Sequence, residues 1–114
     1  MNKNDVKMLL VESRRLISDP QCWVKHDAAK SLDRYGTYWT VRPWHPSACK
    51  WSPKGAVKKI AVYFDMNYAV EQDAVAVLVS VSGHDSLIAF NDNPDTTHGD
   101  VLALFDKAIK ELEN

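Results

Sequence analysis

Residues 97–112, THGDVLALFDKAIKEL, carry the strongest helical pattern in the chain. Apolar side chains recur there at steps of three and four residues, which places them on one face of an α-helix. These side chains are Val101, Leu104, Phe105, Ala108, Ile109 and Leu112. Thr97 and Asp100 resemble a capping box at the start of this helix. We therefore predict an amphipathic final helix that packs its apolar face into the core.

The N-terminal residues show a stripe of the same kind. Its members are Val6, Leu9, Leu10, Ser13, Leu16 and Ile17. Asn4 or Asp5 is the expected cap of this helix. Asp19-Pro20 ends it near Ser18, because proline has no N–H to donate and disfavours helical geometry at the residue before it.

Trp51-Ser52-Pro53 predicts the start of a second helix, with Ser52 as the N-cap and Pro53 at the first helical position. The expected buried face consists of Ala56, Val57, Ile60, Ala61 and Phe64, and the helix should stop near Asp65. Gly55 and Ala56 are small, so another backbone can approach closely there.

Residues 68–81 fit two patterns. Val75, Val77, Val79 and Val81 alternate as in a strand, whereas the alanines and the acidic start suit a helix. We predict a helix that is buried nearly all round, because the segment exceeds a typical strand and ends at Gly83. The alternation of the valines alone does not exclude a strand. A short helix over residues 86–91, capped by Asp85, should bury Leu87, Ile88 and Phe90.

Residues 21–52 are aromatic and rich in turns, and they show no helical period. Thr37 to Val41 has high strand propensity and could pair with Gln21 to Lys25 in a short β-hairpin, with Asp27 to Leu32 forming a helical turn. The predicted fold is therefore mainly α: one domain, residues 1–114, built as a compact bundle of about four helices. The loop-rich aromatic insertion lies between the first two.

The composition excludes several classes of protein. With 114 residues, 46% hydrophobic and 25% charged, the chain matches one globular domain rather than a disordered or membrane protein. A net charge of −1 makes nucleic acid an unfavourable partner. We expect a cytoplasmic protein without a secretory segment, in which Cys22 and Cys49 are reduced thiols.

Four short motifs occur in a recognisable order along the chain. They are Ile17-x-x-Pro20-x-x-Trp23, Trp51-Ser52-x-x-Gly55-Ala56, Phe90-Asn91-Asp92 and Thr97-His98-x-x-Val101. Their order resembles a family of small bacterial and phage proteins that is known as a domain of unknown function. The resemblance implies a helical fold and a bacterial or phage setting, and no activity. It also implies that cysteine often occupies the position of Ser52, so serine here weakens a thiol mechanism.

Ser52 is a candidate nucleophile, because it would lie at a helix N-terminus. Its base would be one of the four histidines, His26, His45, His84 or His98. A plain N-cap explains Ser52 better, because Pro53 beside it fits such a cap and no nucleophile elbow surrounds it. The sequence therefore favours the cap and predicts no catalytic residue.

Asp92, Asp95 and His98 are candidate metal ligands, since carboxylate oxygens and imidazole suit divalent cations. Their spacing matches no calcium loop or zinc motif. An Asx-turn followed by a helix cap explains the same residue types. We therefore expect neither a metal nor a cofactor.

Cations alternate with aromatic side chains in the middle of the chain, as they do in binding surfaces. Trp23 and Trp51 are expected in the core, whereas Trp39 and Trp44 are left undecided. The predicted binding residues lie in two loops, Arg34 to Lys50 and Asn91 to His98. They are Arg34, Trp39, Arg42, Trp44, His45, Asn91, Asp92, Thr97 and His98.

The sequence thus favours a non-catalytic binding protein that sequesters or blocks a protein or a small anionic ligand. For a phage-type protein, a host-defence factor is the natural example of such a partner, by analogy only. The alternative is a small hydrolase that depends on Ser and His or on a metal. A homo-oligomer is a third interpretation, since the apolar segment Ala74 to Val81 exceeds what one small core needs.

Overall fold

The computed structural model describes residues 1–113, which form five α-helices, one 3-10 helix and three β-strands. The helices are α1 (Lys3–Leu16), α2 (Pro53–Tyr63), α3 (Tyr68–Ser82), α4 (Leu87–Asp92) and α5 (His98–Glu113), and the 3-10 helix is η1 (Pro20–Cys22). The strands are β1 (Ala29–Leu32), β2 (Tyr38–Thr40) and β3 (Ala48–Trp51). The prediction of a mainly α fold is confirmed, with five helices instead of about four.

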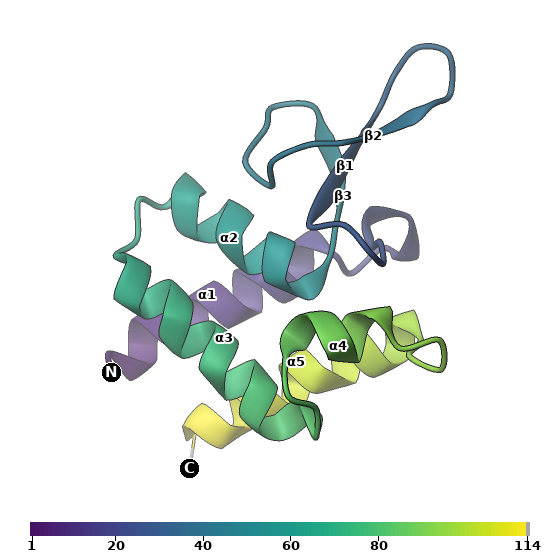
Figure 1. The fold of residues 1–114 in the computed structure, drawn as a ribbon. Helices are drawn as coiled ribbons and strands as arrows, with labels where there is room; N and C mark the ends of the chain where they lie inside the picture. Colours follow the sequence, from purple (N-terminus) through teal and green to yellow (C-terminus); the bar gives the residue numbers. More distant parts are fainter. Residues whose placement is uncertain (114) are drawn as a thin grey trace.

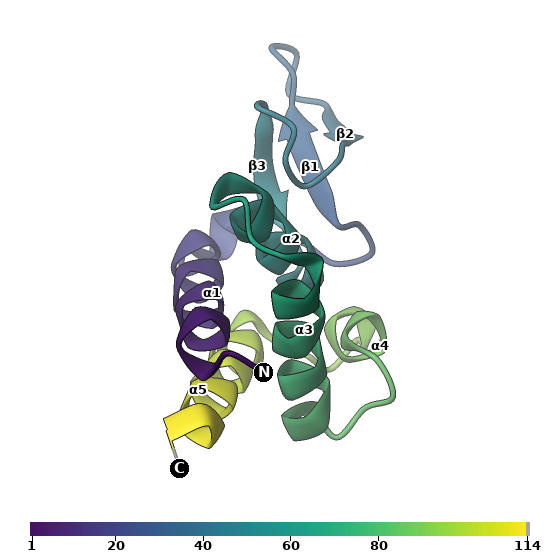
Figure 2. The same cartoon turned by 90° about the vertical axis from the view of Figure 1, so that its left-hand side faces the viewer.

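The helices form one body, and the strands project from it. Helix α1 contacts α2, α3 and α5, and α3 also contacts α2, α4 and α5. The sheet extends from the α2 side of this body, while both termini lie at the opposite end (Figures 1 and 2). Among residues 1–113, no helix is long and apolar enough to cross a membrane.

The two amphipathic helices predicted at the ends of the chain supply a large part of the core. Val6, Leu9 and Leu10 of α1 are fully buried, as are Val101 and Phe105 of α5. The N–H of Thr97 donates to Asp100 Oδ2 at 2.9 Å, and the N–H of Asp100 donates to Thr97 Oγ1 at 3.1 Å. The predicted capping box is therefore confirmed. Asn2 caps α1 instead of Asn4 or Asp5.

Helix α2 begins as predicted. The Ser52 hydroxyl accepts a hydrogen bond from the Gly55 N–H at 3.0 Å, and Pro53 is the first helical residue. Gly55 packs directly against the backbone of Ala28, which explains why a glycine is needed there. Phe64 was wrongly expected in the core: the helix ends at Tyr63, and Phe64 follows it with 45% of its surface exposed.

Residues 68–82 form a helix, so the alternating valines do not mark a strand. Asn67 caps its start and Gly83, in the left-handed conformation with φ 74°, ends it. The expectation that it is buried nearly all round is wrong, because only Ala74 and Leu78 are fully buried. The exposed residues of α3 are Tyr68, Ala69, Gln72, Ala76 and Ser80. Ser86 instead of Asp85 caps α4, and Ile88, which was expected to be buried, is 55% exposed.

The sheet is antiparallel, with strand order β2-β1-β3. The hairpin predicted here exists, but its first strand is β1, within the segment expected as a helical turn. Residues 21–25 instead contribute one isolated bridge, between Trp23 and Trp51. Burial explains the difference: Ala29 and Ser31 alternate toward the interior, and pairing with two strands outweighs any local helical preference.

Candidate functional site

The strands and their connections, residues 29–51, form a projection that we call the sheet arm (Figure 1). Several large side chains of the arm are exposed to solvent: Leu32, Tyr35, Tyr38, Trp39 and Trp44. Trp39 is 59% exposed and Trp44 40% exposed, whereas Trp51 is buried in the core and Trp23 is half-buried against it. The two tryptophans that the sequence left undecided therefore lie on the surface.

The Asp33 carboxylate fixes the tip of the arm. Its Oδ1 accepts hydrogen bonds from the backbone N–H groups of Tyr35 and Thr37, at 2.8 and 2.9 Å. Its Oδ2 accepts the indole N–H of Trp39 at 2.8 Å. These bonds, that of Trp39 foremost and then that of Thr37, lower the pKa of Asp33 from its ordinary value. Trp39 is therefore exposed but held in one orientation.

Cations lie against most of the exposed rings. The guanidinium groups of Arg34 and Arg42 lie 5.1 Å from the ring centre of Tyr35 and 5.7 Å from that of Trp44. Lys50 lies over Tyr38, and Lys58 of α2 lies near both Trp44 and Tyr68. Such contacts are worth roughly 0.5–1 kcal/mol each at exposed sites. They join the arm to α2 in one aromatic and basic surface.

The charge of the chain is strongly segregated. Residues 20–64 contain eight Lys and Arg but two Asp, a net charge of +6. The remaining residues contain six basic and thirteen acidic side chains, and none of residues 65–106 is Lys or Arg. The overall net charge of −1 conceals this division, which a charge profile along the sequence would have revealed.

The second predicted loop, Asn91 to His98, is tied into the protein interior. The amide of Asn91, which is 2% exposed, accepts the indole N–H of Trp23 at 2.7 Å and donates to the Val24 carbonyl at 3.0 Å. His98 has a ring nitrogen 2.7 Å from the carbonyl oxygen of Ile17. Asn91 and His98 thus anchor residues 17–24 to the helices, and Thr97 caps α5.

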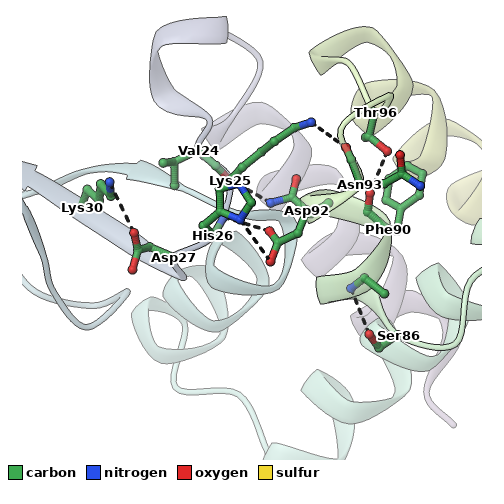
Figure 3. A network of polar contacts seen from close by, with 12 residues as sticks. Val24, Lys25, His26, Asp27, Lys30, Ser86, Phe90, Asp92, Asn93 and Thr96 are labelled. Atoms are coloured by element: carbon green, nitrogen blue, oxygen red, sulfur yellow. Dashed lines mark hydrogen bonds and ion pairs between the residues drawn. The ribbon is translucent and has the colours of Figure 1, made fainter.

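Asp92 holds His26 in place (Figure 3). Its Oδ1 accepts the backbone N–H of His26 at 2.8 Å, and its Oδ2 lies 3.7 Å from Nδ1 of the His26 ring. His26 has φ 72°, a left-handed conformation that is uncommon for histidine. The predicted binding residues therefore separate into an exposed group on the arm and a group with internal contacts.

A small cavity of about 100 Å³ lies between residues 26–28, the N-terminus of α2 and helix α4. His26 and Asp27 line one side, Ser52 and Lys54 line the α2 side, and α4 contributes Leu87, Ile88, Asn91 and Asp92. Of the histidines considered as partners for Ser52, His26 is the one that lines this cavity. The structure thus places one of the four candidate histidines beside the same cavity as Ser52.

Metal ligation and thiol chemistry find little support in the described chain. Within residues 1–113, no group of three or more His, Cys, Asp or Glu side chains is arranged to hold a metal ion. Cys22 and Cys49 are both free thiols. Burial, followed by the charge of Asp19, raises the pKa of Cys22, which disfavours its thiolate form.

Comparison with known proteins adds one finding. Residues 1–111 match the model of a family of unknown function, DUF6197. No curated protein and no solved structure matches the chain.

Proposed function

Since this chain belongs to DUF6197, a family without known function, we propose from its geometry that it is a binding protein whose sheet arm docks on an acidic surface of another protein. The observation that carries the proposal is the exposure of Trp39 together with its fixation by Asp33. A large side chain that is already held in place loses little conformational freedom when it is buried by a partner.

The residue types on the arm also favour a protein partner. Trp, Tyr and Arg are the side chains most enriched among residues that dominate protein–protein binding energies. Arg34 and Arg42 lie against Tyr35 and Trp44, so these rings are partly covered by cations and less available for stacking with nucleic-acid bases. The net charge of +6 over residues 20–64 supports an acidic partner.

The arm projects from the helical body, a shape that suits docking on a macromolecule better than enclosing a small anion (Figure 2). Within the proposal, the protein acts in the cytoplasm of a bacterium, or of an infected bacterial host, by covering part of a larger protein. A host-defence factor is the example of such a partner that a phage setting supplies, by analogy alone.

Two charge-reversal double variants test the proposal with equal changes in net charge. Arg34→Glu with Arg42→Glu alters the arm, and Lys107→Glu with Lys110→Glu alters exposed positions of α5. The probe is poly-L-glutamate, titrated at low salt while the fluorescence of the exposed tryptophans is followed. We expect the arm variant to bind about tenfold more weakly, equivalent to roughly 1.4 kcal/mol, and the α5 variant to bind like the wild type.

If both variants lost the same affinity for poly-L-glutamate, binding would depend on net charge alone, and a binding surface localised on the arm would be refuted. Tighter binding of a single-stranded thymidine oligonucleotide than of poly-L-glutamate would refute the choice of a protein partner.

A further inference from the structure

The cavity beside Ser52 contains a polar group whose hydrogen-bonding capacity is only half used. Ser52 is 9% exposed and its Oγ accepts the Gly55 N–H, but within residues 1–113 the serine hydroxyl has no acceptor for its own proton. Burying a hydroxyl donor without an acceptor is costly. The hydroxyl can therefore donate its proton to a group that binds in the cavity.

A histidine and a carboxylate that contact each other also line this cavity. Asp92 fixes His26 twice, through the backbone N–H at 2.8 Å and beside the ring Nδ1 at 3.7 Å (Figure 3). A carboxylate beside Nδ1 favours the tautomer that carries its proton there, which leaves Nε2 free to accept a proton. Ser52 and His26 both line this cavity of about 100 Å³, and 71% of the His26 side chain is exposed to solvent.

The N-terminus of α2 supplies the third requirement of acyl transfer. The backbone N–H of Lys54 lies in the first turn of α2, where N–H groups have no acceptor within the helix. Such a donor, together with the positive end of the helix dipole, stabilises negative charge on a carbonyl oxygen. Leu87 and Ile88 give the rest of the cavity an apolar lining that suits a short acyl chain.

We propose that this cavity is an acyl-transfer site in which Ser52 is the nucleophile, His26 is the base, Asp92 is a positioning residue, and short-chain esters are the substrate class. Nε2 of His26 removes the proton of Ser52 as Oγ bonds to the carbonyl carbon of the ester. The ester C–O bond then breaks, and the leaving alcohol takes that proton. Water attacks the acyl group in the same way, releasing the carboxylic acid and restoring the hydroxyl. The site is independent of the arm.

The chain contains a matched control for Ser52. Ser86 caps α4 with the same geometry, its Oγ accepting the Ala89 N–H at 3.0 Å, but it is exposed (Figure 3). Ser52→Ala and Ser86→Ala each remove one helix cap, and only the first removes the hydroxyl that lines the cavity. A difference between them therefore reports chemistry in the cavity and not the loss of a cap.

The test incubates the purified wild type and its variants with p-nitrophenyl acetate, following nitrophenol release and locating acetyl groups by peptide mass spectrometry. We expect acetylation of Ser52 in the wild type, and release that falls at least about tenfold in Ser52→Ala but is unchanged in Ser86→Ala. Ser52→Cys should retain turnover, since a thiol is a stronger nucleophile.

Two further variants test the assigned roles. His26→Asn keeps a residue that tolerates the left-handed backbone and should lower nitrophenol release at least about tenfold, because the general base is removed. Asp92→Asn should lower kcat without abolishing turnover and with little change in KM, because the charge beside the imidazole is lost. Circular dichroism confirms that each variant is folded. Wild type that acquires acetyl groups on lysines but none on Ser52, or equal loss of release in both serine variants, would overturn the proposal.

Discussion

Replacement of Gly55 by alanine tests how α2 is attached to the rest of the molecule. A Cβ atom added at Gly55 would overlap the carbonyl oxygen of Ala28 and lie 3.2 Å from its Cα. The obstructing atoms belong to the backbone, which cannot rotate away as a side chain can. The same carbonyl accepts the backbone N–H of Ser52 at 3.1 Å, so the helix can move away only by breaking that bond.

The expected cost follows from these two effects. Overpacking a filled site costs about 1–3 kcal/mol, and loss of a buried hydrogen bond costs about 1–3 kcal/mol more. The better helix propensity of alanine returns up to about 1 kcal/mol. We therefore expect Gly55→Ala to lower the free energy of unfolding by about 3 kcal/mol. The total free energy of unfolding of a domain is typically about 5–15 kcal/mol, so this loss is a large part of it.

Urea denaturation followed by circular dichroism measures this change, with Gly99→Ala as the matched control. Gly99 lies in the first turn of α5, where an added Cβ would meet Thr97 Oγ1 at an ordinary 3.7 Å. The control should be as stable as the wild type or more stable by up to about 1 kcal/mol. A Gly55→Ala protein within about 0.5 kcal/mol of the wild type would refute the close contact between α2 and residue 28.

Three other changes test single parts of the structure. Asn91→Ala should lower the free energy of unfolding by about 2–4 kcal/mol in urea denaturation, because the Trp23 indole and the Val24 carbonyl lose their partner; an unchanged midpoint would contradict this. Thr97→Ala should cost about 1 kcal/mol in the same assay through loss of the cap, and no change would contradict the capping box. The pKa of the Asp33 carboxyl group is lowered in the folded protein. The stabilisation that its hydrogen bonds give to the arm is therefore complete above the ordinary pKa of 3.8, and it is lost as pH falls through the lowered pKa. The fluorescence of Trp39 should therefore stay constant from neutral pH to about pH 4 and change below it, whereas Asp33→Asn should remove that acid transition.

The helices were predictable from the sequence because their signals are local. The stripe over residues 97–112, the Ser52-Pro53 start and Gly83 each specify geometry through a few neighbouring side chains. The choice of helix for residues 68–81 was correct for the same reason. The errors in the helical regions concern burial. Whether Phe64 and the valines of α3 are buried depends on which helices pack beside them.

The sheet was predicted less well because its pairing is not local. Thr37 to Val41 has a strand pattern, but the sequence does not show that β1 is its partner or that β3 joins on the other side. The four residues of β1 include Ala29 and Lys30, which are weak strand formers. Their conformation results from pairing with two other strands.

The candidate sites show the same division. Trp39, Trp44, Arg34 and Arg42 were predicted from residue type alone, and the structure places all four on the arm. The cavity was not predicted, because Ser52, His26 and Asp92 are distant in sequence and meet only through tertiary contacts. The left-handed backbone of His26 was not predicted, since few residues other than glycine adopt that conformation.

Site-specific photocrosslinking in living bacterial cells tests the central claim, that the arm binds an acidic protein, most directly. Benzoylphenylalanine replaces Trp39 in one variant and Ile88 of α4 in another, positions that are 59% and 55% exposed. We predict an adduct with one discrete acidic protein from position 39, none from position 88, and loss of the adduct when Arg34 and Arg42 are both changed to Glu. Equal adducts from both positions, no adduct from position 39, or an adduct with nucleic acid would contradict the account.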